Sequence, residues 1–389
     1  MAGTRASKSA SGRRAYRRIV AKFGTNLLTS GTDQLDTETM AGLVRQVAAL
    51  HGREIEVIVV TSGSIAAGRH RLGGSAGATS ASRRKGTASR QVLASVGQSH
   101  LMHIYDGLFA EHGLVAAQTL LTRRDLADRV GYLNARNTLL QLLDLGAVPV
   151  VNENDAVALD EIEEVRIGDN DSLSALVTNL VDADLLVIAT DTGGLYTADP
   201  RRQPDAELIS CVEKITTEIE SLADDSATRH GVGGMITKLQ AAKLATAGGA
   251  DVVIAGGHEP ELLERLIAGE SVGTIFPATT DRLESRKRWM LAGLAARGKI
   301  VVDAGAANAL ISRGKSLLPA GAREVSGRFD RGDTVSICDE EGRRFAIGIT
   351  NYSREDAAQI LGVRSDRIAK LLGHEYGAEL VHRNNLVLV

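Results

Sequence analysis

The sequence of 389 residues predicts an α/β protein with a mainly parallel sheet covered by helices on both faces, followed by a small β-rich domain. Short apolar runs rich in Val and Ile alternate with amphipathic stretches over residues 19–255. Polar and glycine-rich residues follow the ends of these runs, where parallel sheets bind ligands. From about residue 299 short strand-like runs follow one another between glycine and aspartate turns, which indicates a separate β-rich domain.

The elements of the first domain are predicted from the length and spacing of these runs. Strands are expected at residues 19–23, 55–60, 147–151, 185–189 and 252–255. Helical spacing predicts helices at residues 40–50, 91–112 and 239–247. Thr37 is the expected N-cap of the first of these helices. In the C-terminal domain, strands are expected at residues 300–302, 334–338 and 345–350.

Two segments interrupt this alternation. Residues 63–70 have the glycine spacing of a P-loop, but Arg69 and His70 replace the Lys and Ser/Thr, so we interpret the segment as a strand-to-helix turn. Residues 72–89 are small and polar, which predicts a flexible loop.

The formal net charge of −3 conceals an uneven distribution. Residues 1–18 carry six basic and no acidic side chains, whereas residues 19–278 carry 21 basic and 34 acidic ones, a balance of −13. The near-neutral total excludes a globally basic nucleic-acid-binding protein. We predict a disordered basic tail at residues 1–17, a main domain at 18–278, a linker at 279–296 and a C-terminal domain at 297–389.

Composition also limits the class of protein. No apolar run reaches the roughly 18 residues of a membrane helix, so no membrane partner is expected. Cys211 and Cys338 lie far apart and form no ligand-like spacing, so neither a disulfide framework nor a zinc site is predicted. A reducing cytoplasm fits this cysteine usage.

Three groups of polar residues indicate an anion site next to a polar ligand site. Lys22 ends the first strand beside a Gly turn, where it is placed to meet phosphate, although a solvated surface lysine is equally compatible. Residues 231–238, Gly-Val-Gly-Gly-Met-Ile-Thr-Lys, open a helix with a glycine-rich loop and a lysine, which is typical of anion binding. Residues 152–155 and 168–171 concentrate carboxylates and amides after a buried strand. Such side chains can bind an ammonium group or magnesium, and we consider this more plausible than turns in which they only bond to their own backbone.

These motifs together resemble the glutamate 5-kinases of the amino acid kinase family. The resemblance rests on Lys22-Phe23-Gly24-Thr25, Thr61-Ser62-Gly63-Ser64-Ile65-Ala66-Ala67-Gly68, Asn152-Glu153-Asn154-Asp155, Gly168-Asp169-Asn170-Asp171 and Gly233-Gly234-Met235-Ile236-Thr237-Lys238. It implies an αβα sandwich with a mainly parallel, eight-stranded sheet, and a C-terminal domain similar to PUA domains. It also implies ATP-dependent phosphorylation of the γ-carboxylate of L-glutamate to L-glutamyl 5-phosphate, the first step of proline biosynthesis.

The resemblance assigns a role to each matching residue. Lys22 and Lys238 would stabilise the transferring phosphoryl group, and Asp171 would orient both lysines. Glutamate would be bound by Ser62, Asp155 and Asn170. The ATP site would comprise Lys22, Thr190, Asp191, Gly231, Val232, Gly233, Gly234, Met235, Ile236, Thr237 and Lys238. Magnesium would arrive on ATP, so no residue is assigned to it directly.

The resemblance also implies partners and marks two departures. It implies a homo-oligomer, either a dimer or a tetramer, feedback inhibition by L-proline, and handover of the product to glutamate-5-semialdehyde dehydrogenase. Residues 72–89 and 159–164 are longer than expected for the family, and the second expansion lies in the loop that would fold over glutamate.

Two other functions remain open from the sequence. An acetylglutamate or aspartate kinase would share the phosphate motifs, but Asp155 and Asn170 favour a free α-ammonium group over an acetylated one. RNA binding by the C-terminal domain is disfavoured, because that domain carries a net charge of only +2 and few aromatic residues.

Overall fold

The computed structural model describes residues 16–32, 34–73, 87–158, 170–224, 234–279 and 296–388. Its internal contacts divide these residues into two compact units. One unit contains residues 16–126 and 138–279, and the other contains residues 127–137 and 296–388. The predicted tail and linker lie almost entirely outside the described residues, so the predicted domain boundaries stay a prediction.

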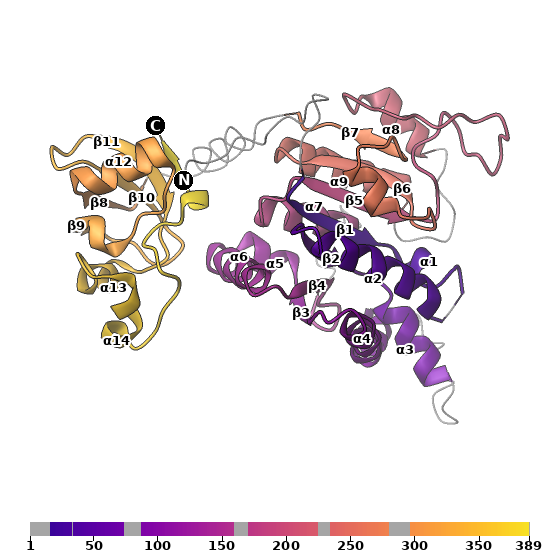
Figure 1. Ribbon diagram of the computed structural model, residues 1–389, viewed down its shortest axis with the longest axis horizontal. Helices are drawn as coiled ribbons and strands as arrows, with labels where there is room; N and C mark the ends of the chain where they lie inside the picture. The colour runs from indigo at the N-terminus through magenta and orange to yellow at the C-terminus, as the bar shows by residue number, and fades with distance from the viewer. Residues whose placement is uncertain are drawn as a thin grey trace. The chain divides into compact units, whose positions relative to one another are not determined.

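The first unit is built on a seven-stranded sheet in the order β3-β4-β2-β1-β5-β6-β7 (Figure 1). Its strands are β1 (Arg18–Phe23), β2 (Glu56–Val60), β3 (Ala116–Leu121), β4 (Val148–Glu153), β5 (Leu185–Thr190), β6 (Asp251–Gly256) and β7 (Thr274–Phe276). Each neighbouring pair from β3 to β6 is parallel, and β7 is antiparallel to β6. The predicted parallel sheet is therefore confirmed, with seven strands in the described part of the chain where the resemblance implies eight.

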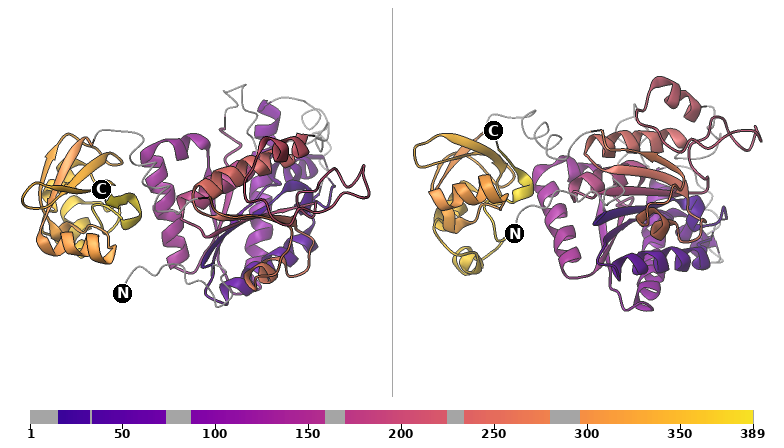
Figure 2. Two further views of the ribbon diagram at one scale, coloured as in Figure 1. Left: turned by 90° about the horizontal axis from the view of Figure 1, so that it is seen from above. Right: turned by 45° about the horizontal axis from the view of Figure 1, so that its top comes forward.

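Helices cover both faces of this sheet (Figure 2). One face packs against α2 (Thr37–His51), α4 (Thr87–Ala110) and α10 (Leu262–Ile267), and the other packs against α7 (Asn170–Leu180) and α9 (Met235–Ala247). The remaining helices are α1 (Thr25–Leu28), α3 (Ser64–Gly73), α8 (Thr217–Asp224), α5 (Arg123–Ala127) and α6 (Arg129–Asp144), and residues 127–137 of the last two belong to the second unit. Ala21 and Phe23 of β1 lie in the core beneath α2 and α4. Because side chains alternate along a strand, Lys22 lies on the α7 and α9 face.

One local prediction is wrong, and a second has the wrong bounds. The N-cap of α2 is Asp36 and not Thr37, because the Asp36 carboxylate accepts hydrogen bonds from the backbone N–H groups of Glu38 and Thr39. Hydrogen bonds from Ser30 and Thr39 lower the pKa of Asp36 to about 2, so this cap is charged at neutral pH. The predicted loop at 72–89 is too long at both ends, because α3 extends to Gly73 and α4 begins at Thr87, and residues 74–86 lie outside the described residues.

The strand-to-helix turn predicted at residues 63–70 is confirmed, and glycines allow the helix after it to pack closely. Gly63 has φ of +99° between β2 and α3. A Cβ at Gly68 would lie 1.9 Å from the Leu93 carbonyl oxygen, and one at Gly97 would lie 1.8 Å from the Ser64 carbonyl oxygen. Glycine at both positions therefore permits the backbones of α3 and α4 to approach each other this closely.

This close crossing predicts a large loss of stability in Gly97→Ala. We expect the free energy of unfolding to fall by about 3 kcal/mol, because neither helix backbone can move without disturbing the core. Gly107→Ala is the matched control on α4, since it has no atom within 4 Å of the new Cβ and should gain up to about 1 kcal/mol. Urea unfolding measures both variants, and equal stabilities would contradict the packing argument.

The second unit contains a five-stranded sheet in the order β12-β11-β10-β8-β9. Its strands are β8 (Gly298–Val302), β9 (Ala322–Gly327), β10 (Thr334–Cys338), β11 (Arg344–Ile349) and β12 (Leu386–Leu388). Its helices are α12 (Ala304–Arg313), α13 (Arg354–Gln359) and α14 (Ile368–Leu372). The three predicted strands correspond to β8, β10 and β11, and β9 and β12 complete a sheet with its own apolar core.

Candidate active site

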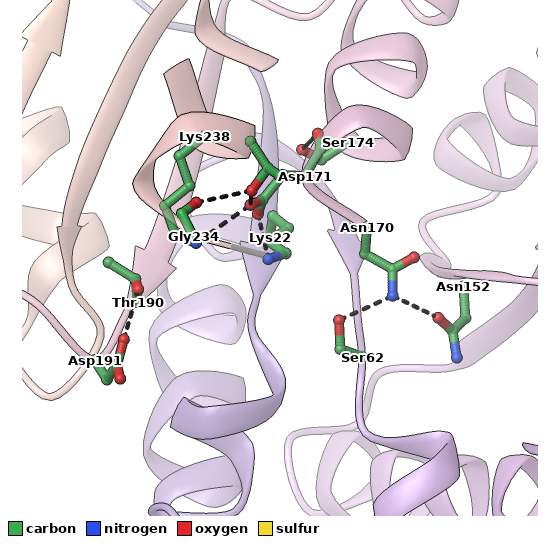
Figure 3. Close-up of polar contacts among 11 residues, drawn as sticks. Lys22, Ser62, Asn152, Asn170, Asp171, Ser174, Thr190, Asp191, Gly234 and Lys238 are labelled. Carbon is green, nitrogen blue, oxygen red and sulfur yellow. Dashed lines mark hydrogen bonds and ion pairs between the residues drawn. The ribbon is translucent and has the colours of Figure 1, made fainter. Parts of the chain in front are cut away.

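The centre of the site is one buried carboxylate between two buried lysines (Figure 3). Asp171 is fully buried, and its Oδ1 forms an ion pair with Nζ of Lys22. Its Oδ2 lies 3.2 Å from Nζ of Lys238. Lys22 and Lys238 are 3% and 8% exposed. The three side chains together carry one net positive charge, which is costly to bury and which a bound anion would stabilise.

Three separate elements bring these charges together. Lys22 comes from β1 at the centre of the sheet, where it pairs in register with Val60 and Ile188. Asp171 lies in the first turn of α7, where the helix dipole favours a negative charge. Lys238 lies in the first turn of α9, where the dipole disfavours a positive charge. The ion pair with Asp171 therefore offsets an unfavourable position of Lys238 at the start of α9.

The amino-terminal end of α9 provides further polar groups. Gly234 is its N-cap and supplies no side-chain hydrogen bond to the first turn. The hydroxyl of Thr237 lies 2.9 Å from Oδ2 of Asp171 and 2.8 Å from the carbonyl oxygen of Gly234. A helix start with uncapped N–H groups beside a lysine is suited to bind phosphate.

An open cavity adjoins Lys238. It is lined by Asn26, Thr190, Asp191, Thr192, Gly194, Leu195, Tyr196, Ala198, Asp199, Pro200, Arg201, Leu222, Gly234, Met235 and Lys238. Five of the residues predicted for the ATP site are among them: Thr190, Asp191, Gly234, Met235 and Lys238. Ile236 and Thr237 lie in the adjoining turn of α9, and Gly231, Val232 and Gly233 lie outside the described residues.

Asp191 is held as a carboxylate at the edge of this cavity. Burial raises its pKa, but hydrogen bonds from Asn26 and Thr190 and the charge of Lys238 bring the pKa below its ordinary value. Asn26 Nδ2 lies 3.2 Å from one carboxylate oxygen, and the Thr190 hydroxyl lies 3.0 Å from the other. Sequence reasoning missed Asn26, although it directly follows the quoted Lys22-Phe23-Gly24-Thr25 motif.

A second polar cluster begins one residue before Asp171. The side-chain Nδ2 of Asn170 donates to the Ser62 hydroxyl at 2.9 Å and to Oδ1 of Asn152 at 3.1 Å. The structure thus brings together two of the three predicted glutamate-binding residues, Ser62 and Asn170. The third, Asp155, accepts a 3.3 Å hydrogen bond from the Ser64 hydroxyl. Asn152 and Ser64 belong to the quoted motifs, but sequence reasoning gave them no role.

The described residues contain neither a preformed cluster of metal ligands nor a membrane span. In the ranges that the structure describes, no three His, Cys, Asp or Glu side chains gather to hold a metal ion. None of the helices in those ranges is long and apolar enough to cross a bilayer. Both oxygens of Asp171 already face lysines, so this carboxylate serves the lysine pair.

Comparisons with known proteins show the family to which the chain belongs. Residues 17–256 match the amino acid kinase family, and residues 298–372 match the PUA domain. A glutamate 5-kinase from Dehalococcoides mccartyi is 52% identical over 96% of this chain and 99% of its own length. Glutamate 5-kinases from Herpetosiphon aurantiacus and Deinococcus radiodurans are 51% and 48% identical, each over 96% of this chain and 98% and 100% of their own lengths. The chain therefore belongs to the glutamate 5-kinase family, with an amino acid kinase domain followed by a PUA domain.

Proposed function

We propose that this protein transfers the γ-phosphoryl group of ATP to the γ-carboxylate of L-glutamate and forms L-glutamyl 5-phosphate, the first step of proline biosynthesis. Relatives named glutamate 5-kinase support this substrate. One observation carries the proposal: the cavity beside Asp191, the lysine pair on Asp171 and the amide cluster at Asn170 follow one another across the site (Figure 3). ATP, the transferring phosphoryl group and glutamate would occupy these places in that order.

The side chains support a direct attack by the carboxylate. A γ-carboxyl group with a reference pKa near 4.3 is ionised at neutral pH, so no general base is needed. The obstacle is the repulsion between this anion and the phosphates of ATP. Lys22 and Lys238 supply fixed positive charge where negative charge develops during transfer, and Asp171 keeps both ammonium groups in place.

The glutamate end of the proposed site rests on Ser62, Asp155 and Asn170. Oδ1 of Asn170 is buried and has no hydrogen-bond partner among the described residues, so it can accept from the α-ammonium group. Asp155 supplies a carboxylate of opposite charge to that ammonium group. Asn170 and Asp171 are consecutive, which would bring bound glutamate next to the lysine pair.

We propose that magnesium enters the site on ATP. The carboxylate of Asp171 is engaged by lysines, so the ion would be bound mainly by phosphate oxygens. Magnesium would neutralise part of the phosphate charge. The predicted oligomer, the inhibition by L-proline and the handover to a dehydrogenase stay predictions of the family resemblance.

The substrate can be tested by trapping the acyl phosphate with hydroxylamine. The protein is incubated with ATP, magnesium and one of L-glutamate, N-acetyl-L-glutamate or L-aspartate, and the hydroxamate is measured. We expect product from L-glutamate alone, because Asp155 and Asn170 favour a free ammonium group at the distance set by the glutamate side chain. Product from either of the other acids in place of L-glutamate would overturn the proposal.

The hydrogen bond of Thr237 to Asp171 predicts a further effect on turnover. We expect Thr237→Val to lower kcat about tenfold, since a hydrogen bond to a charged group is lost while the side-chain shape is kept. Thr246→Val is a control on α9, because the Thr246 hydroxyl donates to its own helix at Ala242. Steady-state rates with saturating ATP and glutamate measure both variants, and equal kcat values would contradict this role of Thr237.

A further inference from the structure

One face of α4 forms hydrogen bonds with residues at the ends of two strands. Gln91, Gln98 and Tyr105 are spaced seven residues apart, which places them on the same side of the helix two turns apart. Gln91 Nε2 donates to the Ala158 carbonyl oxygen at 3.2 Å. The hydroxyl of Tyr105 lies 2.8 Å from that of Thr61, directly after β2. Between these two contacts, Gln98 reaches the end of β4.

The orientation of the amide of Asn152 can be deduced from its neighbours. The backbone N–H of Glu153 can only donate, and it lies 2.9 Å from Oδ1 of Asn152. The other atom of this amide is therefore Nδ2, a donor, and it points at Oε1 of Gln98 at 2.8 Å. Asn152 is 1% exposed, so water cannot replace Gln98 as the acceptor without a change in packing.

The same reasoning extends to Asn170. Oδ1 of Asn152 accepts from Nδ2 of Asn170, so the oxygen of the Asn170 amide must lie on the opposite side. That oxygen is buried and has no partner in the part of the chain that the structure describes. A chain of three amides thus runs from Gln98 to an unpaired acceptor, and the bond from Asn152 to Gln98 helps to keep every amide in this orientation.

We propose that Gln98 is a positioning residue that keeps the Asn170 oxygen turned towards the α-ammonium group of glutamate. This inference rests on the proposed function. Without the Gln98 acceptor, the buried Nδ2 of Asn152 loses its hydrogen bond, and among the described residues only the N–H of Glu153 then orients the amide that accepts from Asn170. A less firmly held Asn170 amide can turn its NH₂ group towards the ammonium group, which can only donate, and this weakens glutamate binding.

Replacing Gln98 with methionine tests this role, because methionine has a similar length and lacks the amide oxygen. We expect Gln98→Met to raise the KM for glutamate roughly tenfold and to leave the KM for ATP and the melting temperature nearly unchanged. Ser99→Ala is the matched control, since the exposed Ser99 hydroxyl donates only to Val96 of its own helix. If Gln98→Met does not fold, Gln98→Ala is measured in its place, because it removes the same amide oxygen.

Glutarate distinguishes positioning from a general structural effect, because it is glutamate without the α-amino group. We expect Gln98→Met to leave the inhibition constant of glutarate within twofold of the wild-type value while the KM for glutamate rises. An unchanged KM for glutamate, or an equal loss for both acids, would overturn the role of Gln98. Failure of the wild-type protein to form glutamyl hydroxamate would instead overturn the proposed function, so the two failures are distinguishable.

Discussion

Lys238→Ala is expected to lower kcat by at least about 100-fold, and Lys22→Ala should have an effect of the same size. Each substitution removes a fixed positive charge from the proposed place of phosphoryl transfer, and one such contact contributes about this much to turnover. Both ammonium groups are already held by Asp171 before substrate binds, so no reorganisation is required during the reaction. Hydroxamate formation at saturating ATP and glutamate measures kcat for each variant.

Lys243→Ala provides the control for these variants. Lys243 lies on α9, five residues after Lys238, but its side chain is 66% exposed and pairs with Glu220 at the surface. We expect its kcat to stay within twofold of the wild-type value, because a surface ion pair contributes little. Near-normal turnover in Lys238→Ala or Lys22→Ala would contradict the assignment of these lysines to phosphoryl transfer.

The second large effect is expected from Asp171→Asn, which keeps the side-chain shape and removes its charge. Two buried ammonium groups are then left beside a neutral amide, and loss of one partner from a buried ion pair typically costs about 3–5 kcal/mol. We expect the free energy of unfolding to fall by this amount and kcat to fall by at least about 100-fold, because neither lysine keeps its position. Urea unfolding and the hydroxamate assay measure the two effects separately.

Glu220→Gln is the matched substitution for the stability measurement. It removes a carboxylate charge from an exposed pair with Lys243, and the expected change in the free energy of unfolding is below about 0.5 kcal/mol. Equal stabilities of the two variants would show that Asp171 does not hold the lysine pair.

The strands that are buried on both faces are the ones that the sequence predicts best. The strands β1, β2, β4, β5 and β6 are continuous apolar runs at the centre of the sheet, and all five were predicted within two residues at either end. The strands β3 and β7 were not predicted. β3 reads Ala-Ala-Gln-Thr-Leu-Leu, lies at one edge and is mostly half-buried, and β7 has only three residues at the other edge. An edge strand pairs with one strand only and is more exposed to solvent, so its sequence contains fewer apolar residues and is harder to recognise.

The site was predictable where its residues follow strands or open helices. Lys22, Asp171 and Lys238 stand in such positions, and the structure brings all three together. Gln98 gave no comparable signal, because a glutamine within a helix is ordinarily exposed to solvent. Its contact with Asn152 joins residues 54 positions apart in the sequence and depends on how α4 packs against the sheet.

Phosphoryl transfer to the γ-carboxylate is tested most directly with L-glutamate labelled with ¹⁸O in that carboxylate. Attack on ATP forms a bond between a labelled oxygen and phosphorus and releases ADP. The α-amino group of the product then attacks the acyl carbon, the carbon–oxygen bond breaks, and phosphate leaves with the labelled oxygen. Mass spectrometry of the released phosphate should find one ¹⁸O atom per molecule, whereas phosphate without ¹⁸O would mean that water and not glutamate attacks ATP, and would contradict the proposed reaction.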